Sequence, residues 1–496
     1  MSTALVTALA LGGCASGTES TPGESVSTLR IGALGNTSDN LDPLTVNGFA
    51  DYIAVGHLYE MLVELRDGVA QFSLAEDITS NDDATEWTIT FVEDATFSDG
   101  SPVTAQDVAY SLQLLGDPSA SPNYASFYQD IDPNGFEVID DKTLVVSLTR
   151  PRGDFITTIL AFASFVFPDG FNDWENPVGS GPYTLVSYDA GQQIVLEARD
   201  DYRDGIPQLE RLEVTVIDDP QTRMNALKSG EIDFATRVDP VIVQAEANNP
   251  DVVIHRGGEG DSQVMGFEMN VHQAPFDDPR VREAMKLAID REELVETIFL
   301  GEGYVGNDLV GLGLDGYNES IPQREHDPDR ARELFAEAGV TEVTIRTAEI
   351  TPGLTRAAEL YIEQLAEAGI TATIEPTDPA GFFSDFEVLL STPLQVAYYI
   401  NRDAGAYLGS FGGSNGFFNM SGYAPPEFDA LLLQAQSTAN ADARAELFDQ
   451  AQQQIWDEGG TILWGYQAVL NAHAPGLEGV YLSQGVPVFH EAAFTR

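Results

Sequence analysis

Two stretches of sequence decide the fold, and the first is Phe97-Ser-Asp-Gly-Ser-Pro-Val-Thr-Ala-Gln-Asp-Val-Ala-Tyr-Ser-Leu112. Its Ser98-Asp99-Gly100 segment has the residue types of a tight turn. Thr104, with Asp107 three residues later, matches the start of a helix, because the two side chains satisfy backbone N–H groups that have no partner there. The stretch therefore predicts a turn that leads into a capped helix.

The second stretch is Pro275-Phe-Asp-Asp-Pro-Arg-Val-Arg-Glu-Ala-Met-Lys-Leu-Ala-Ile-Asp-Arg291. Asp278-Pro279 predicts a helix start, with Asp as the N-cap and Pro at the first helical position. Asp290 and Glu293 predict that a second helix begins directly afterwards. Apolar residues recur at offsets of three and four, so the first helix has one buried face (Val281, Met285, Ala288).

Two segments farther along the chain alternate strand, helix and strand, the pattern of α/β folds. Their strands are Leu212–Ile217 and Ile232–Ala235 in the first segment, and Val343–Arg346 and Thr371–Ile374 in the second. Between about 70 and 150 the pattern changes, because Trp87–Val92 and Thr143–Leu148 read as antiparallel strands. The sequence predicts two α/β regions, the first with an α+β insertion.

Composition excludes several classes of protein. The chain has 496 residues, of which 43% are apolar, so it forms a sizeable core in two to four domains and is not disordered as a whole. It carries 79 Asp and Glu against 24 Lys and Arg, a formal charge of −55. No basic face for phosphates is visible, which excludes a nucleic-acid partner.

The N-terminus carries the single cysteine, Cys14, after an apolar run. Leu11-Gly-Gly-Cys14 resembles a bacterial lipobox, which implies a signal peptide, lipidation of Cys14 and a tether within residues 1–27. The apolar run is too short to span a bilayer. No Lys or Arg precedes Cys14, so the usual charged start of a signal peptide is missing. The alternative is an uncleaved, unstructured N-terminus.

Signatures of catalysis are scarce. The sequence has no Gly-x-Ser-x-Gly elbow, no phosphate-binding loop and no His-Glu-x-x-His. The six histidines are dispersed and one cysteine cannot build a metal site, so we expect no cofactor and no metal. A hydrolase with a carboxylate pair, such as a glycosidase, stays open as an alternative because carboxylates are abundant.

The longer runs, taken in order, resemble the peptide/nickel-type (family 5) extracellular solute-binding proteins of ABC transporters over residues 28–496. Beside the two stretches above, the runs are Leu41-Asp-Pro-Leu44, Tyr59-Glu-Met-Leu62, Gly179-Ser-Gly-Pro-Tyr183, Asn225-Ala-Leu-Lys-Ser-Gly-Glu-Ile-Asp233 and Asp327-Pro-Asp-Arg-Ala-Arg-Glu-Leu-Phe-Ala-Glu-Ala-Gly339. Most of their residues are turns and caps. They therefore identify the fold more than the ligand.

This resemblance implies an α/β, two-lobed fold of the type II periplasmic-binding-protein kind with an extra insertion subdomain. Lobe one would comprise residues 28–268 and 465–496, with the insertion at about 50–178, and lobe two would comprise 269–464. We place the two crossings between the lobes near 266–270 and 463–466. Ligand would lie between the lobes, which close by hinge bending.

The resemblance also suggests ligand contacts. In similar oligopeptide binders an extended segment lines the cleft, and here it corresponds to Asn47, Gly48 and Phe49. A second wall corresponds to residues 398–408, with Tyr398, Tyr399, Asn401, Arg402, Asp403 and Tyr407 as candidates. Each tyrosine has two alternative roles, stacking on the ligand or lying half-buried in a strand. Arg402 would either clamp a carboxylate of the ligand or form an ion pair, on the surface or between the lobes.

Two features of this wall limit the comparison. The Asp that often pairs with a peptide ammonium in the family falls near Ile400 or Asn401 and is missing, so Asp403 is the candidate replacement. Trp464, beside the second predicted crossing, either faces ligand or packs in the hinge.

The function that follows is capture of a solute, by default an oligopeptide or dipeptide, and its delivery to an ABC permease without chemistry. We expect a monomer outside the cytoplasm, held at the outer face of the cell membrane by a lipid on Cys14 or located in the periplasm. Nickel complexes, opines, oligosaccharides and other small solutes remain alternative ligands. A sensor partner in place of an importer is also open.

Overall fold

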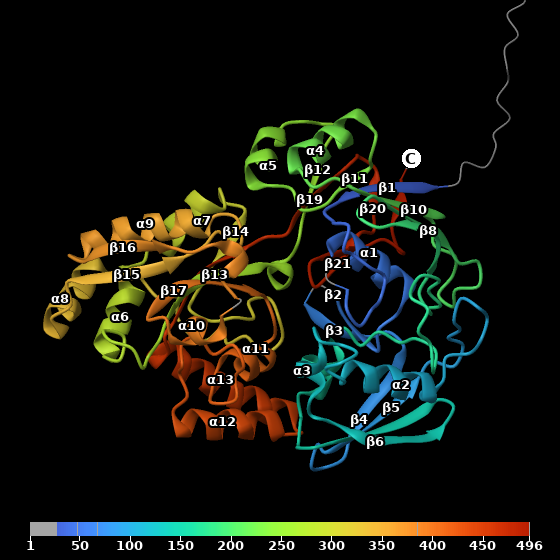
Figure 1. Ribbon diagram of the computed structural model, residues 1–496, viewed down its shortest axis with the longest axis horizontal. Coiled ribbons are helices and arrows are strands. Elements are labelled where there is room, and N and C mark those ends of the chain that lie inside the picture. The colour runs from blue at the N-terminus through green and yellow to red at the C-terminus, as the bar shows by residue number, and fades with distance from the viewer. Residues whose placement is uncertain (1–26, 47, 67, 384, 496) are drawn as a thin grey trace, which may run out of the picture.

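The computed structural model describes residues 27–46, 48–66, 68–383 and 385–495, and shows two bodies side by side (Figure 1). Cys14 and the predicted tether up to residue 26 lie outside the described residues, as does Asn47. The first body is built on a seven-stranded and a four-stranded sheet, and the second on a six-stranded sheet. We call them lobe one and lobe two.

The seven-stranded sheet of lobe one is assembled from both ends of the described chain. Its strands, in spatial order, are β12 (Val253–Arg256), β19 (Leu470–His473), β11 (Phe234–Ala235), β1 (Thr28–Ala33), β10 (Arg211–Val216), β9 (Gln193–Ala198) and β8 (Tyr183–Asp189). The central strand β1 is parallel to β10 and β11. Helix α4 (Pro220–Ser229) links β10 to β11, with Asp219 as N-cap and Gly230 in the left-handed region, which confirms the predicted strand–helix–strand unit.

The α+β insertion lies within lobe one. Its antiparallel sheet has the order β4 (Ala75–Ser80), β5 (Glu86–Phe91), β7 (Thr143–Leu148) and β6 (Ile131–Asp140), beside helix α2 (Ala105–Leu115). Asp107 Oδ2 accepts a hydrogen bond of 2.7 Å from the Thr104 backbone N–H, so the predicted cap is confirmed. The pairing of β5 with β7 likewise confirms the antiparallel strands.

Lobe two contains the second predicted α/β unit. Its sheet has the order β14 (Gly303–Val305), β18 (Thr461–Gln467), β13 (Gln263–Met269), β17 (Leu394–Ile400), β15 (Glu342–Thr347) and β16 (Thr371–Pro376). Strands β15 and β16 are parallel and joined by α9 (Leu354–Glu367). Asp278 caps α6 (Pro279–Ala288) and Asp290 caps α7 (Arg291–Ile298), as the sequence predicts.

The remaining elements are three pairs of short strands and the other helices. The strand pairs are β2 (Val63–Arg66) with β3 (Val69–Phe72), β20 (Leu477–Glu478) with β23 (Ala493–Phe494), and β21 (Tyr481–Ser483) with β22 (Val486–Val488). The helices are α1 (Phe49–Leu58), α3 (Ala125–Tyr128), α5 (Pro240–Glu246), α8 (Pro328–Ala338), α10 (Phe386–Ser391), α11 (Ala404–Phe411), α12 (Pro426–Ser437), α13 (Ala441–Glu458), η1 (Ile156–Leu160), η2 (Glu259–Asp261) and η3 (Pro379–Gly381).

The chain passes between the lobes at positions that differ from the prediction. Residues 266–270 and 463–466, the predicted crossings, fall almost wholly in β13 and β18, which pair with each other inside the sheet of lobe two. Both strands are almost entirely buried, because their continuous apolar runs suit a central strand covered on both faces. The crossings are instead the segments 257–262, after β12, and 468–469, before β19.

Asn401 fixes the first crossing segment to lobe two. Its side-chain amide donates to the carbonyls of Glu259, at 3.1 Å, and Leu312, at 2.8 Å, and accepts a bond of 3.0 Å from the Gly311 N–H. The residue is 7% exposed, so water does not replace these bonds. Asn401, predicted as a ligand contact, is therefore a structural anchor.

We expect Asn401→Ala to lower the free energy of unfolding by on the order of 3 kcal/mol, because buried backbone groups lose their partners. Urea unfolding followed by tryptophan fluorescence measures the change. The control is Asn415→Ala, at an exposed position, which should change stability by less than about 0.5 kcal/mol. Equal effects of the two substitutions would contradict the anchoring role.

Asp51, in the first turn of α1, carries a buried carboxyl group. It is 1% exposed, and no described group hydrogen-bonds to its Oδ2. Burial, and the nearby Asp39 carboxylate, raise the pKa of Asp51 to about 7. Folding therefore takes up a proton at this side chain between about pH 4 and 7.

We expect this proton uptake to make the folded protein less stable as the pH rises from about 4 to 7, because the unfolded chain releases the proton first. Asp51→Asn is neutral throughout and lacks this loss, so the variant gains stability relative to the wild type between pH 5 and pH 8. Thermal unfolding at both pH values, with the exposed Asp94→Asn as control, measures the difference. A parallel pH dependence of Asp51→Asn and wild type would contradict the burial argument.

Candidate functional site

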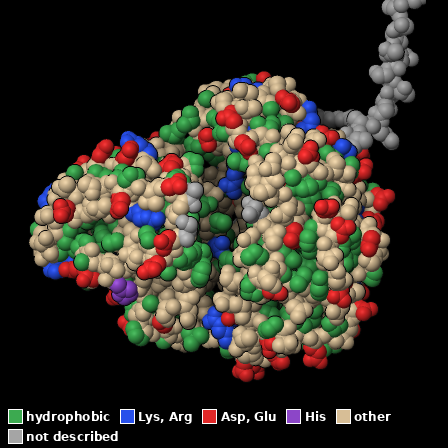
Figure 2. Space-filling view, in the orientation of Figure 1, with side chains coloured by type: hydrophobic (Ala, Val, Ile, Leu, Met, Phe, Trp, Pro, Cys, Tyr) green, Lys and Arg blue, Asp and Glu red, His purple; other side chains and the backbone are tan. Residues whose placement is uncertain are grey.

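A cavity of about 580 Å³ runs through lobe one to the seam between the lobes. One face of α1 forms its floor, because the lining residues Phe49, Tyr52, Ile53, Gly56 and His57 follow the spacing of a single helical face. Figure 2 shows a hollow between the two bodies with Lys or Arg side chains inside it, whereas carboxylates are scattered over the outer surface. The volume suits a small organic solute.

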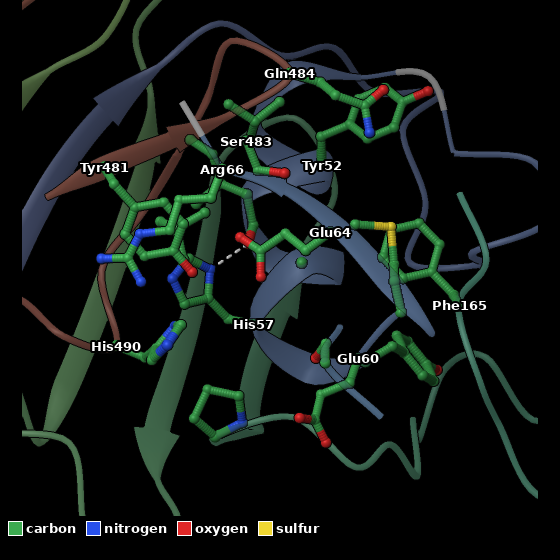
Figure 3. A pocket seen from close by; sticks show the side chains of 18 of the residues that line it. Tyr52, His57, Glu60, Glu64, Arg66, Phe165, Tyr481, Ser483, Gln484 and His490 are labelled. Carbon is green, nitrogen blue, oxygen red and sulfur yellow. Dashed lines mark hydrogen bonds between the residues drawn. The ribbon is translucent and has the colours of Figure 1, made fainter. Parts of the chain in front are cut away.

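The C-terminal part of the chain forms the opposite wall of the cavity. Tyr481, Ser483 and Gln484 come from β21 and the turn after it, and His490 follows β22 (Figure 3). Strand β22 also packs on α1. Lobe two contributes Ile400, the last residue of β17, which is 46% exposed at the seam.

His57 ties the floor of the cavity to this wall. Its Nε2 accepts a hydrogen bond of 2.9 Å from the Phe489 N–H, so Nδ1 carries the proton and donates to the Ile53 carbonyl at 2.6 Å. Burial lowers the pKa of His57 to about 4, which leaves the ring neutral. His57 is thus a structural link and not a charged ligand contact.

Arg237 places a half-buried positive charge at the seam end of the cavity. It follows β11 in the left-handed backbone region, with φ of 44°, and its backbone N–H donates to Asn471. The guanidinium carbon lies 4.5 Å from the centre of the Phe49 ring. Nε has no hydrogen-bond partner among the described residues, and burial lowers the pKa of Arg237.

Arg402 brings a second positive charge from lobe two. Its guanidinium carbon lies 4.8 Å from the ring centres of both Phe127 and Phe162, which belong to lobe one. These are cation–π contacts across the seam. Burial lowers the pKa of Arg402 to about 10, still well above neutral pH.

Neither Arg237 nor Arg402 has a hydrogen-bond acceptor for its side chain among the described residues. Every other arginine in the described ranges donates at least one side-chain hydrogen bond or forms an ion pair. The two seam arginines are therefore exceptional in a chain that holds a large excess of carboxylates.

Aromatic hydroxyl groups lie between and beside these two charges. Burial raises the pKa of Tyr398, while Arg237 and Arg402 both act to lower it, so both cations lie near this hydroxyl. Tyr52 and Tyr124, which line the cavity, have hydroxyl oxygens 2.7 Å apart. Because Tyr124 donates to the Val46 carbonyl, Tyr52 is the donor of that pair.

The structure brings some of the predicted contacts to the seam. Phe49 lines the cavity, and Tyr398 and Arg402 lie at its edge. Gly48 is the N-cap of α1, where an added Cβ would lie 2.3 Å from the Asp39 carboxyl carbon. Its place is thus fixed by close packing. Ligand contact by these residues stays a prediction, and Asn47 lies outside the described residues.

The other predicted contacts have structural roles. Tyr399 and Tyr407 are each 3% exposed in the core of lobe two, where the Tyr399 hydroxyl donates to Glu268 at 2.6 Å. Trp464 is 0% exposed and stacks on Phe299. Asp403 caps α11, where it accepts from the Ala406 N–H at 3.0 Å. Strand β17 alternates its faces, so Tyr398 points toward the seam when Tyr399 points into the core.

Sequence reasoning missed Arg237 and the wall formed by residues 481–491. The spacing of the residues on α1 would have identified the floor of the cavity. No local sequence pattern identifies Arg237, because what distinguishes it is that its side chain has no hydrogen-bond acceptor among the described residues.

Neither a metal-binding cluster nor a membrane-spanning helix is found in the part of the chain that the structure describes. In the parts of the chain that the structure describes, no group of three or more His, Cys, Asp or Glu residues is arranged to hold a metal ion. Among the helices of the same ranges, none combines the length and the apolar character needed to cross a membrane.

Comparison with solved structures identifies the fold. HbpA2 from Haemophilus parasuis matches with a TM-score of 0.83 and 22% identity, over 95% of this chain and 100% of that one. The periplasmic binding protein DppA from Helicobacter pylori, in complex with the peptide STSA, matches with a TM-score of 0.75 and 21% identity, over 95% and 98% of the two chains. At these identities the likeness shows the fold alone.

Sequence comparison identifies the family. The glutathione-binding protein GsiB of Salmonella typhi is 26% identical over 475 residues, which cover 91% of each chain. Residues 71–424 match the family described as bacterial extracellular solute-binding proteins, family 5. The chain therefore belongs to the family 5 extracellular solute-binding proteins, which are non-catalytic components of ABC transporters.

Proposed function

We propose that this protein captures a solute with a carboxylate group at the seam between its lobes, closes around it and delivers it to an ABC permease. The observation that carries the proposal is the pair of seam arginines, Arg237 and Arg402, which have no acceptor among the described residues. A carboxylate is the natural partner of such a group, since it accepts two parallel hydrogen bonds from one guanidinium.

Even partial burial of a charge without a hydrogen-bond acceptor is costly, and a bound anion offsets this cost. Tyr398, near both cations, supplies a hydroxyl donor for the same anion. Phe49 supplies an aromatic face that holds the Arg237 guanidinium in place within lobe one, while Phe127 and Phe162 receive Arg402 when the lobes are together. A site that is arranged in advance loses less entropy on binding.

The two arginines also provide a mechanism for closure. Arg237 belongs to lobe one and Arg402 to lobe two, so an anion that contacts both joins the lobes. Such a ligand binds the closed form more tightly than the open form and shifts the population toward closure. The short crossings at 257–262 and 468–469 are the positions where this movement would occur.

A peptide is the default solute, because one solved structure of this fold holds the peptide STSA and a curated relative binds the tripeptide glutathione. Nickel complexes, opines and oligosaccharides are the other classes left open. Lipid attachment at Cys14 also remains part of the proposal on the basis of the lipobox-like sequence, and location outside the cytoplasm on the basis of the family. We propose a monomeric state as well.

Thermal shift across a panel of solutes with and without a carboxylate tests this function. We expect at least one solute with a carboxylate to stabilise the protein, by about 2.7 kcal/mol at a concentration of 100 times Kd. Arg402→Ala should weaken its binding at least tenfold, because the anion loses a charged partner. Arg356→Ala, which removes an exposed arginine of α9, is the matched control and should have no effect.

Equal affinities of Arg402→Ala and Arg356→Ala would exclude Arg402 from the site. Stabilisation by uncharged solutes alone would contradict the anionic ligand.

A further inference from the structure

The cavity extends well beyond the seam arginines. Arg237 stacks on Phe49, the first residue of α1, and the floor continues along the helix past Gly56 to Glu60, two residues after the helix ends. Ten helical residues at 1.5 Å each make the two ends of this floor about 15 Å apart. Figure 3 shows Glu60 and Glu64 among the side chains that surround this inner part.

The inner end of the cavity, which we call the inner chamber, is acidic. It is lined by Glu60, Glu64, Arg66, Arg203, Tyr481, Ser483, His490 and Glu491. Arg66 forms two bonds of 2.7 Å with Glu491, and Arg203 contacts Glu60 at 2.5 Å. Arg66 also lies near Glu64, but both of its hydrogen bonds go to Glu491, so Glu64 has no ion pair among the described residues.

The other titratable groups leave this negative charge in place. Burial lowers the pKa of His490, and burial lowers that of His57 as well, so neither ring is positive at neutral pH. Asp204, at the edge of the chamber, adds a further carboxylate. The inner chamber is therefore opposite in charge to the seam.

Three acceptor atoms in the inner chamber are buried without a hydrogen-bond partner among the described residues. They are Glu60 Oε2, Glu64 Oε1 and Ser483 Oγ. Glu60 itself is only 7% exposed. The Ser180 hydroxyl lies beside the Glu60 carboxylate, but outside hydrogen-bonding geometry. The Tyr481 hydroxyl lies beside Glu64 and leaves Oε1 without a donor.

We propose that the inner chamber is a second ligand subsite, which takes an ammonium or guanidinium group at the far end of the solute whose carboxylate lies at the seam. This inference rests on the proposed function, because it needs the carboxylate at Arg237 and Arg402. The ligand is then an elongated zwitterion with its charges about 15 Å apart. An extended peptide of four or five residues has this length, at 3.3–3.6 Å per residue.

The chemistry of the chamber favours a cation over water or an apolar group. An ammonium has three N–H donors and no acceptor, which matches two carboxylate oxygens and one hydroxyl oxygen that accept no hydrogen bond from the described residues. An ammonium also compensates the negative charge of Glu64. Burial raises the pKa of both Glu60 and Glu64, which means that the chamber solvates their carboxylates poorly, so a bound cation would stabilise them.

Gly56 keeps the path between the two ends open. No atom lies within 4 Å of the position that a Cβ would occupy at this residue, although it sits in the middle of α1. A larger side chain would project into the cavity without a clash. It would also strengthen the helix, since Gly costs about 1 kcal/mol relative to Ala there. Gly56→Leu therefore blocks the cavity in a protein that still folds.

The test uses three equimolar mixtures of random-sequence tetrapeptides, with free ends, with N-acetylated ends and with C-terminal amides, and reads binding by native mass spectrometry. We expect wild type to bind the free mixture at least tenfold more tightly than either blocked mixture. Glu64→Gln should remove the preference over the N-acetylated mixture, while Glu76→Gln, at an exposed position, should not. Gly56→Leu should weaken the affinity for tetrapeptides at least tenfold, and Gly56→Ala should bind them as tightly as wild type.

The possible failures are distinguishable. Equal binding of the free and N-acetylated mixtures would overturn the cationic subsite and leave the seam site intact. If no tetrapeptide binds but another solute binds in a manner that depends on Arg402, the inner subsite for an elongated zwitterion is wrong and the proposed function stands. If neither the mixtures nor any solute of the thermal-shift panel binds, the proposed function fails as well.

Discussion

A half-buried guanidinium group is only partly hydrated and needs a hydrogen-bond acceptor nearby, yet no described residue accepts a hydrogen bond from the side chain of Arg237 or Arg402. The chain has carboxylates in large excess, and its other described arginines all have partners. Aromatic rings hold the two seam cations without neutralising them. These charges without acceptors raise the free energy of the folded protein. In our proposal an anionic solute offsets that cost, and this contributes to its binding free energy.

The fold places these two charges on opposite lobes at the seam, where a ligand that binds both would affect lobe closure. Each lobe has its own hydrophobic core, and two short segments join them. The first segment is anchored on lobe two by Asn401 and on lobe one by Asp261, whose carboxylate accepts from the Gly485 N–H at 3.0 Å. If the lobes turn about these segments, as we propose, an anion that contacts both arginines favours the closed arrangement.

Much of the architecture could be predicted from local chemistry. The caps at Thr104, Asp219 and Asp278 and the strand–helix–strand units follow from residue types at fixed spacing, which act within one or two turns of chain. The crossings were harder to place, because the apolar runs of β13 and β18 resemble any buried strand. The site was hardest, since Tyr398 and Tyr399 differ only in the face of β17 that each occupies. Arg237 is distinguished by a missing acceptor, which no local pattern in the sequence records.

Solution scattering of the purified protein tests the central claim most directly, because it reports the separation of the lobes. Adding a solute with a carboxylate should lower the radius of gyration of wild type toward a closed form. Arg402→Ala should keep the larger radius at the same concentration. An unchanged radius of wild type at saturating solute would contradict closure, and an equal decrease in Arg402→Ala would show that its charge is not what draws the lobes together.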